Sequence, residues 1–165
     1  MVNGDKMSKS LKRVKTALRT AGLINTVVET GTARTAANAA EALGCEIDQI
    51  AKSIIFAGLQ TQQAVLFVTA GSNLVNIEKA TKLAKEPLGK ADAAFIREQT
   101  GFAIGGVSPV GHLNTVKAFM DPRLFEFDKI WAAAGTPNHV FSICPTKLQL
   151  LCGADIWLFT DSKKM

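Results

Sequence analysis

The chain has 165 residues, enough for one domain with a hydrophobic core of its own. Hydrophobic residues make up 47% of the chain and charged residues 20%, which excludes an intrinsically disordered protein. No apolar run approaches the roughly 20 residues that a membrane span needs. The three cysteines and two histidines share no metal-ligand spacing, and the net charge of +5 suits a polyanionic partner without identifying one. We therefore expect a soluble, cytoplasmic protein with reduced thiols and no metal site.

Hydrophobic periodicity predicts helices and strands along the whole chain. A helix is expected at 8–21, where apolar residues recur at three- and four-residue steps, and at 36–43, where strong helix formers lie between the capping residues Thr35 and Gly44. Further helices are expected at 76–84, 91–99 and 145–151. Strands are expected in β-branched and aromatic runs, at 26–30, 53–57, 64–69, 115–120, 130–133, 140–143 and 157–160. The run at 130–133 also fits the entry to a turn, and the run at 157–160 is expected to close the sheet. This order predicts one α/β domain over 8–165, with a mixed, largely hairpin-connected sheet, after a flexible leader at 1–7.

Lys52 is unusual because it lies inside an apolar stretch. Isoleucines surround it on both sides, and it stands at the expected entrance to the strand at 53–57. An ammonium group there would bind a phosphate, or stabilise the oxyanion that develops when an ester is attacked. The alternative is a lysine that reaches water from the end of a strand.

The segment Ile104–Gly111 is a glycine-rich loop that contains Pro109. Consecutive glycines allow backbone N–H groups to approach a carbonyl oxygen or a phosphate closely. The loop matches neither a dinucleotide-binding fingerprint nor a phosphate-binding P-loop, which disfavours a nucleotide site. On its own it also fits an ordinary turn.

A third polar segment, Gly135–His139, precedes the strand expected at 140–143. His139 could act there as an acid, a base or a hydrogen-bond donor, although glycine, proline and asparagine are also usual in a structural turn. The cysteines have no recognisable base partner, so a thiolate nucleophile is not expected.

Taken together and in this order, the motifs resemble the YbaK/prolyl-tRNA-synthetase-associated editing domain family. The resemblance runs from about Leu11 to Asp161. It depends on Thr35-Ala36-x-x-Ala39-Ala40-x-x-Leu43-Gly44, Gln49-Ile50-Ala51-Lys52-Ser53-Ile54-Ile55-Phe56, Thr100-Gly101-x-x-x-Gly105-Gly106-Val107-Ser108-Pro109, Asp121 and Ala133-Ala134-Gly135-Thr136-Pro137-Asn138.

The resemblance implies a mixed, strongly curved, barrel-like sheet surrounded by helices, and a trans-acting aminoacyl-tRNA deacylase that needs no cofactor. The implied substrate is tRNA for proline that carries a small wrong amino acid: alanine, cysteine, serine or 2-aminobutyrate. Prolyl-tRNA synthetase is a further implied partner, whereas DNA and membranes are not. The chain contains no tyrosine, so any contact that a tyrosine makes elsewhere in the family is missing.

Site residues follow from matching the family motifs. The resemblance places catalysis at Lys52, Gly105 and Gly106, and substrate binding at Val107, Ser108, Pro109, Gly135, Asn138 and His139. A basic helix face would steer the tRNA acceptor stem, through Lys12, Arg13, Lys15 and Arg19, with Lys79, Lys82, Lys85 and Lys90 as further candidates. Two alternatives stay open: a binding module of the same fold that does not catalyse, and a nucleotide- or small-molecule-binding α/β protein.

Overall fold

A computed structural model describes residues 8–24 and 26–161, so the leader expected at 1–7 lies outside the described residues. The helices are α1 (Lys9–Thr20), α2 (Ala36–Leu43), α3 (Ile77–Ala84), α4 (Ala93–Thr100) and α5 (Pro145–Cys152), with 3-10 turns η2 (Ile47–Gln49) and η3 (Pro122–Glu126). The strands are β1 (Val27–Glu29), β2 (Ile50–Gly58), β3 (Ala64–Ala70), β4 (Leu74–Val75), β5 (Leu88–Lys90), β6 (Lys117–Met120), β7 (Ile130–Ala133), β8 (His139–Ile143), β9 (Asp155–Ile156) and β10 (Thr160–Asp161).

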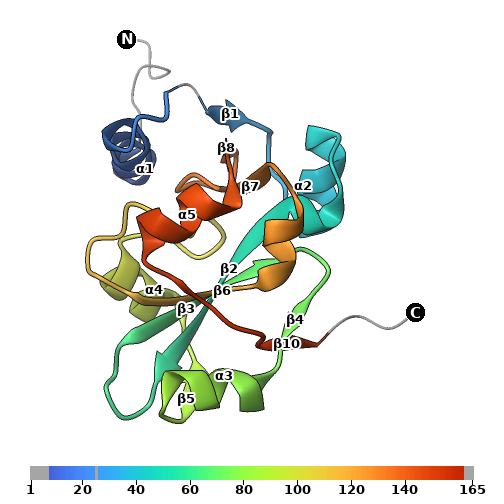
Figure 1. Cartoon of the computed structure of the whole chain (residues 1–165). Helices are drawn as coiled ribbons and strands as arrows, with labels where there is room; N and C mark the ends of the chain where they lie inside the picture. The colour runs from blue at the N-terminus through green and yellow to red at the C-terminus, as the bar shows by residue number, and fades with distance from the viewer. Residues whose placement is uncertain (1–7, 25, 162–165) are drawn as a thin grey trace.

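The main sheet has the strand order β1-β8-β7-β2-β3-β6-β9, and β5 also pairs with β2 (Figure 1). Two antiparallel hairpins, β2–β3 and β7–β8, lie side by side through the parallel pairing of β2 with β7. Strands β6 and β9 continue the sheet in parallel beyond β3. The sheet is therefore mixed, as the sequence predicted.

Strand β3 is buried along its whole length because both faces of the sheet are covered. Leu66 and Val68 point into a core that α1, α4 and α5 share, whereas Val65 and Phe67 point into a second core under α3. This two-sided burial explains why the sequence of β3 is continuously apolar instead of alternating.

Capping residues define the helix ends, at Ser8 for α1 and, as the sequence predicted, at Thr35 and Gly44 for α2. The Ser8 hydroxyl accepts a hydrogen bond from Leu11 N at 3.0 Å, and the Thr35 hydroxyl accepts one from Asn38 N at 3.0 Å. Gly44 ends α2 with a φ of +67°, a left-handed conformation that glycine adopts without strain.

The end of the chain differs from the prediction. Residues 157–160 do not close the sheet: β9 lies at its edge beside β6, and Thr160 pairs instead with Val75 in a separate two-stranded sheet. Trp157 and Leu158 are exposed, whereas Phe159 is buried in the core under α3, so only part of this apolar run is packed inside the protein. The short elements η2, η3, β4 and β5 were also not predicted, because two to five residues carry no periodicity. No helix in residues 8–24 and 26–161 has both the length and the apolar character that crossing a bilayer requires.

Candidate functional site

A gap in the sheet lies along one edge of β2. The ladder with β7 ends at Ala51, and the ladder with β5 begins at Phe56. Between them, in the described part of the chain, no strand pairs with residues 52–55 on this edge, although their other edge is paired with β3 throughout. Unpaired strand edges present N–H and C=O groups to whatever lies beside them.

A cavity of about 580 Å³ opens at this gap. Its walls come from β2, from the segment around the start of α2, from the glycine-rich loop and from β7 with the turn that follows it. Lining side chains and backbone include Arg34, Thr35, Lys52, Ser53, Gly71, Ile96, Gly105, Val107, Trp131, Thr136 and His139. This volume lies in the range of small-ligand pockets.

Lys52 lies two residues inside β2 instead of at its entrance, and its half-buried side chain lines the cavity. Its ammonium group donates a hydrogen bond to the backbone oxygen of Asn73 at 2.7 Å. Burial lowers the pKa of Lys52 below its ordinary value, and the carboxylates of Asp48 and Asp121 oppose this shift. The site therefore holds a cation whose amine is partly desolvated.

The glycine-rich loop meets the cavity through Gly105 and Val107. Gly106 is buried, its N–H donates to Ala103 O at 3.0 Å, and a Cβ added to it would lie 2.9 Å from Cα of Thr136. Glycine is therefore required here for the close backbone approach of the loop to the turn at 135–139. Gly106 shapes the site, and its N–H is already engaged.

Ser108 and Pro109 are buried and do not line the large cavity. The Ser108 hydroxyl accepts a hydrogen bond from Val110 N at 3.2 Å, and Pro109 faces a second hollow on the other side of the loop. The structure thus brings Lys52, Gly105 and Val107 together around one cavity and places Ser108 and Pro109 behind them.

Arg13 holds both ends of the segment Gly101–Gly111, which contains the glycine-rich loop. Its guanidinium group donates to Gly101 O at 2.7 Å and to Gly111 O at 3.0 Å, and it lies over the Phe102 ring, 4.8 Å from the centroid. Arg13 is partly exposed, and two of its five N–H donors are used inside the protein, so its role in steering tRNA stays a prediction.

Replacing Arg13 with alanine should destabilise the protein by about 2 kcal/mol, because hydrogen bonds from a charged group to two loop carbonyls are lost. Arg13→Lys should recover only part of this stability, since an ammonium group does not reproduce the forked contacts or the stacking on Phe102. Urea denaturation measures the difference. Equal stability of wild type and Arg13→Ala would contradict the assignment.

His112 supports the same loop from behind. Its Nε2 lies 2.6 Å from Ser108 O, which only accepts, so Nε2 carries the proton. The Nδ1 atom is buried without a partner in the described residues, and burial lowers the pKa of His112. A neutral His112 that donates to the loop backbone is the form this environment favours.

The turn at 135–139 contributes His139, which lines the cavity and whose Nδ1 lies 2.7 Å from the Thr136 hydroxyl. Gly135 has a φ of +96° and packs against the backbone of Ser10, so it positions the turn. The Asn138 side chain accepts from the Thr32 hydroxyl at 2.9 Å and does not line the cavity. Of the three predicted residues in this turn, only His139 lies at the cavity.

The sequence did not single out several cavity residues. Ser53 lines the gap with a buried hydroxyl that has no hydrogen-bond partner in the described residues. Arg34 and Trp131 are also part of the lining, and Asn73 supplies the carbonyl that holds Lys52. Consecutive side chains of a strand face opposite sides of the sheet, so the position of Lys52 does not indicate Ser53, and nothing in the sequence connects Asn73 with Lys52.

The basic residues of α1 lie away from this cavity. Lys12 and Arg19 are exposed. Lys15 and Arg19 border a separate hollow beside Leu23 and Val27. Lys79 contacts Asp161 at 4.0 Å and donates to Thr160 O, so its charge is partly compensated. A role for the α1 residues in tRNA binding remains a prediction.

Comparisons with known proteins agree with this geometry. The family model of the aminoacyl-tRNA editing domain matches residues 30–151, which include β2, the glycine-rich loop and the turn. The uncharacterized protein YwhH of Bacillus subtilis (strain 168) is 30% identical over 150 residues, which cover 90% of this chain and 95% of YwhH.

Solved structures show the same likeness. A crystal structure of a protein proposed to be a trans-editing enzyme for prolyl-tRNA synthetase is 42% identical, with a TM-score of 0.87, covering 95% of this chain and all of that chain. The hypothetical protein APE2540 is 26% identical, with a TM-score of 0.82, covering 90% and 99% of the two chains. On its matched residues and its fold, the chain belongs to the aminoacyl-tRNA editing domain family.

Proposed function

We propose that this protein is a trans-acting hydrolase that cleaves the ester between a wrong amino acid and its tRNA. The observation that carries the proposal is the convergence of Lys52 and the glycine-rich loop on one cavity, within a chain of the editing domain family. The substrate we propose is tRNA for proline that carries alanine, cysteine, serine or 2-aminobutyrate. The 42% identity to the protein proposed to edit for prolyl-tRNA synthetase supports this choice.

In the proposed mechanism the acyl group enters the cavity at the gap beside β2. The Lys52 ammonium group lies near the terminal phosphate or ribose and the scissile carbonyl. The N–H groups of Gly105 and Val107, the loop residues at the cavity, polarise the carbonyl oxygen, because the Gly106 N–H is bound to Ala103. Water then attacks the carbonyl carbon, activated in part by the substrate's own groups, and the ribose hydroxyl leaves.

An editing step that follows amino-acid selection by the synthetase is needed for an energetic reason. A synthetase pocket separates amino acids that differ by one methylene by only about 1–3 kcal/mol, so errors must be removed after charging. We propose that the protein acts in the cytoplasm, where tRNA is charged, and that prolyl-tRNA synthetase is a partner.

The function is tested with a deacylation panel. Purified protein is mixed with tRNA for proline charged with alanine, cysteine, serine, 2-aminobutyrate or proline, with and without a chelator. The proposal predicts hydrolysis of at least one small wrong amino acid well above the spontaneous rate, with proline spared and no effect of the chelator. Spontaneous rates for every ester would contradict it.

A tRNA partner predicts a steep salt dependence of binding. If Lys12, Lys15 and Arg19 contact phosphates, the apparent affinity should fall with a log–log slope of about −0.7 to −0.9 per contact. Replacing these three residues with glutamine should flatten the slope by about 1 per lost contact. Filter binding over a range of KCl concentrations measures both slopes, and an unchanged slope in the triple variant would remove α1 from the interface.

The second candidate is a module of the same fold that binds tRNA or a synthetase without hydrolysis. The exposed basic residues of α1 lie away from the cavity, so they would bind tRNA without taking part in hydrolysis, and this favours a pure binding function. The panel separates the two functions, because a pure binding module would protect the ester or leave its spontaneous rate unchanged.

A further inference from the structure

A short wall separates the large cavity from a smaller one, and this wall holds Lys52. It consists of Gly71, Ser72 and Asn73, which connect β3 to β4. Gly71 lines the large cavity, whereas Ser72 and Asn73 line a neighbouring cavity of about 420 Å³. The carbonyl of Asn73 accepts the hydrogen bond from the Lys52 ammonium group. The position of that amine therefore depends on where the wall lies.

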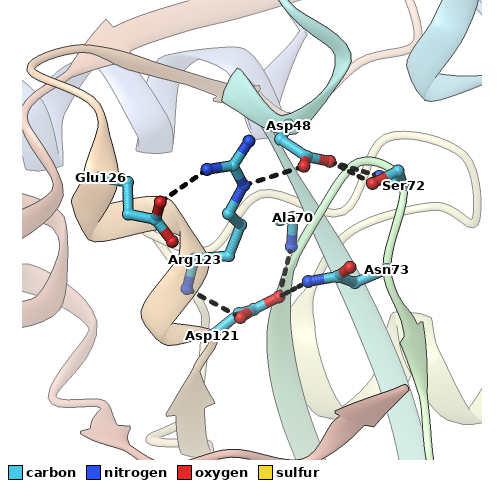
Figure 2. Close-up of polar contacts among 7 residues, drawn as sticks. All are labelled: Asp48, Ala70, Ser72, Asn73, Asp121, Arg123 and Glu126. Atoms are coloured by element: carbon cyan, nitrogen blue, oxygen red, sulfur yellow. Dashed lines mark hydrogen bonds and ion pairs between the residues drawn. The ribbon is translucent and has the colours of Figure 1, made fainter. Parts of the chain in front are cut away.

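Two carboxylates in the smaller cavity hold the wall in place (Figure 2). Asp48 accepts hydrogen bonds from the backbone N–H of Ser72 at 2.8 Å and from its hydroxyl. Asp121, which is 1% exposed, accepts from the Asn73 side chain at 2.9 Å and from Ala70 N at 3.1 Å. Ser72 and Asn73 are therefore each hydrogen-bonded to a carboxylate from another element.

Arg123 connects the two carboxylates, as Figure 2 shows. Its Nε donates to Asp48 at 2.9 Å, and its backbone N–H donates to Asp121 at 2.9 Å. A second guanidinium nitrogen donates to Glu126 at 2.7 Å, on the solvent side. Burial opposes ionisation of Asp48, but hydrogen bonds from Ser72 and Arg123 outweigh it and hold the pKa of Asp48 below its ordinary value. The anion that braces the wall is therefore present at neutral pH.

The wall also fits too closely to move without a cost. A Cβ added to Gly71 would clash with the backbone oxygen of Ile47, in the same 3-10 turn that carries Asp48. Because glycine has no Cβ, Gly71 lets the wall pack directly on η2. Asp48, in the same turn, accepts the hydrogen bond from the N–H of the next wall residue, Ser72.

We propose that Asp48, held by Arg123, is a positioning residue for Lys52: it fixes the wall at Ser72 and Asn73 and so fixes the amine in the editing cavity. This inference rests on the proposed function for the part that concerns turnover. Two carboxylates face the amine, Asp48 from η2 and Asp121 from the end of β6, and both favour its charged form. Arg34, which precedes α2, and His139 of β8 line the same cavity.

The test uses Asp48→Asn, which keeps the shape of the side chain and removes its charge. Glu126→Gln is the matched control, because it removes the other carboxylate on Arg123 without touching the wall. The reactivity of Lys52 toward acetic anhydride is followed by mass spectrometry across the alkaline pH range. Hydrolysis of tRNA for proline charged with alanine is measured in parallel. Thermal unfolding of each variant reports on stability.

In Asp48→Asn the titration of Lys52 should move to lower pH, because one of the two negative charges facing the amine is gone. Turnover should fall by about tenfold, the effect of losing one hydrogen bond to a charged group. Glu126→Gln should match the wild type in both readouts. If Asp48→Asn lowers only the melting temperature and leaves the Lys52 titration unchanged, the residue is merely structural and the inference is overturned.

The two hypotheses fail separately. A shifted Lys52 titration in a protein that cleaves no ester would support the positioning role and reject the proposed hydrolase. An unshifted titration in an active enzyme would reject the positioning role and leave the hydrolase intact.

Discussion

Lys52→Ala should lower the rate of aminoacyl-tRNA hydrolysis by about 10²–10³, the usual loss when one well-aimed group that stabilises the transition state is removed. Lys52 lines the cavity and its ammonium group donates a hydrogen bond to Asn73 O, so the substitution removes one cation from the cavity and one hydrogen bond from the wall. Single-turnover hydrolysis of tRNA for proline charged with alanine, with enzyme in excess, measures this loss directly.

Lys147→Ala is the matched control for Lys52→Ala. Lys147 belongs to α5, and its partly exposed side chain does not line the cavity. It should hydrolyse the ester at the wild-type rate. Activity of Lys52→Ala within a fewfold of wild type would refute the role given to Lys52.

Gly106→Ala is expected to have the second largest effect. The new methyl group would lie 2.9–3.1 Å from the backbone of Thr136, which is not the end of a flexible side chain and therefore cannot move aside cheaply. We expect a destabilisation of about 1–3 kcal/mol from overpacking. Because the loop and the turn that carries His139 are pushed apart, turnover should fall by at least about tenfold, which corresponds to about 1.4 kcal/mol of transition-state stabilisation.

Gly153→Ala provides the control for Gly106→Ala. Gly153 ends α5 with a φ of +63° and has no atom within 4 Å of an added Cβ, so alanine causes backbone strain without a clash. It should cost about 1 kcal/mol of stability and leave turnover per folded molecule unchanged. Equal turnover of the two variants would show that the contact between loop and turn does not matter for catalysis.

Local signals in the sequence were sufficient for the long elements. Thr35 and Gly44 marked both ends of α2, and the apolar run at 64–69 marked β3. The segment 157–160 misled the prediction because apolar character does not say which strand a residue pairs with: Phe159 is buried, but Thr160 pairs with Val75 outside the main sheet.

The candidate site was predictable only in part. Lys52 and the glycine-rich loop stood out as unusual residue types in their contexts, and the cavity contains both. The gap in the pairing of β2 and the wall at Gly71–Asn73 arise from contacts between residues far apart in the chain, so no local pattern encodes them. Arg13 shows the reverse case: it follows the pattern of a basic helix face, and two of its donors are nevertheless used by loop carbonyls some 90 residues away.

The most direct measurement is a crystal structure of the protein with an amide analogue of 3′-alanyl-adenosine, which cannot be hydrolysed. The account predicts the alanyl carbonyl in the cavity beside β2, within hydrogen-bond distance of the Lys52 amine or of the N–H groups of Gly105 and Val107. An analogue bound on α1 or elsewhere outside this cavity, or one whose carbonyl faces away from both groups, would contradict it.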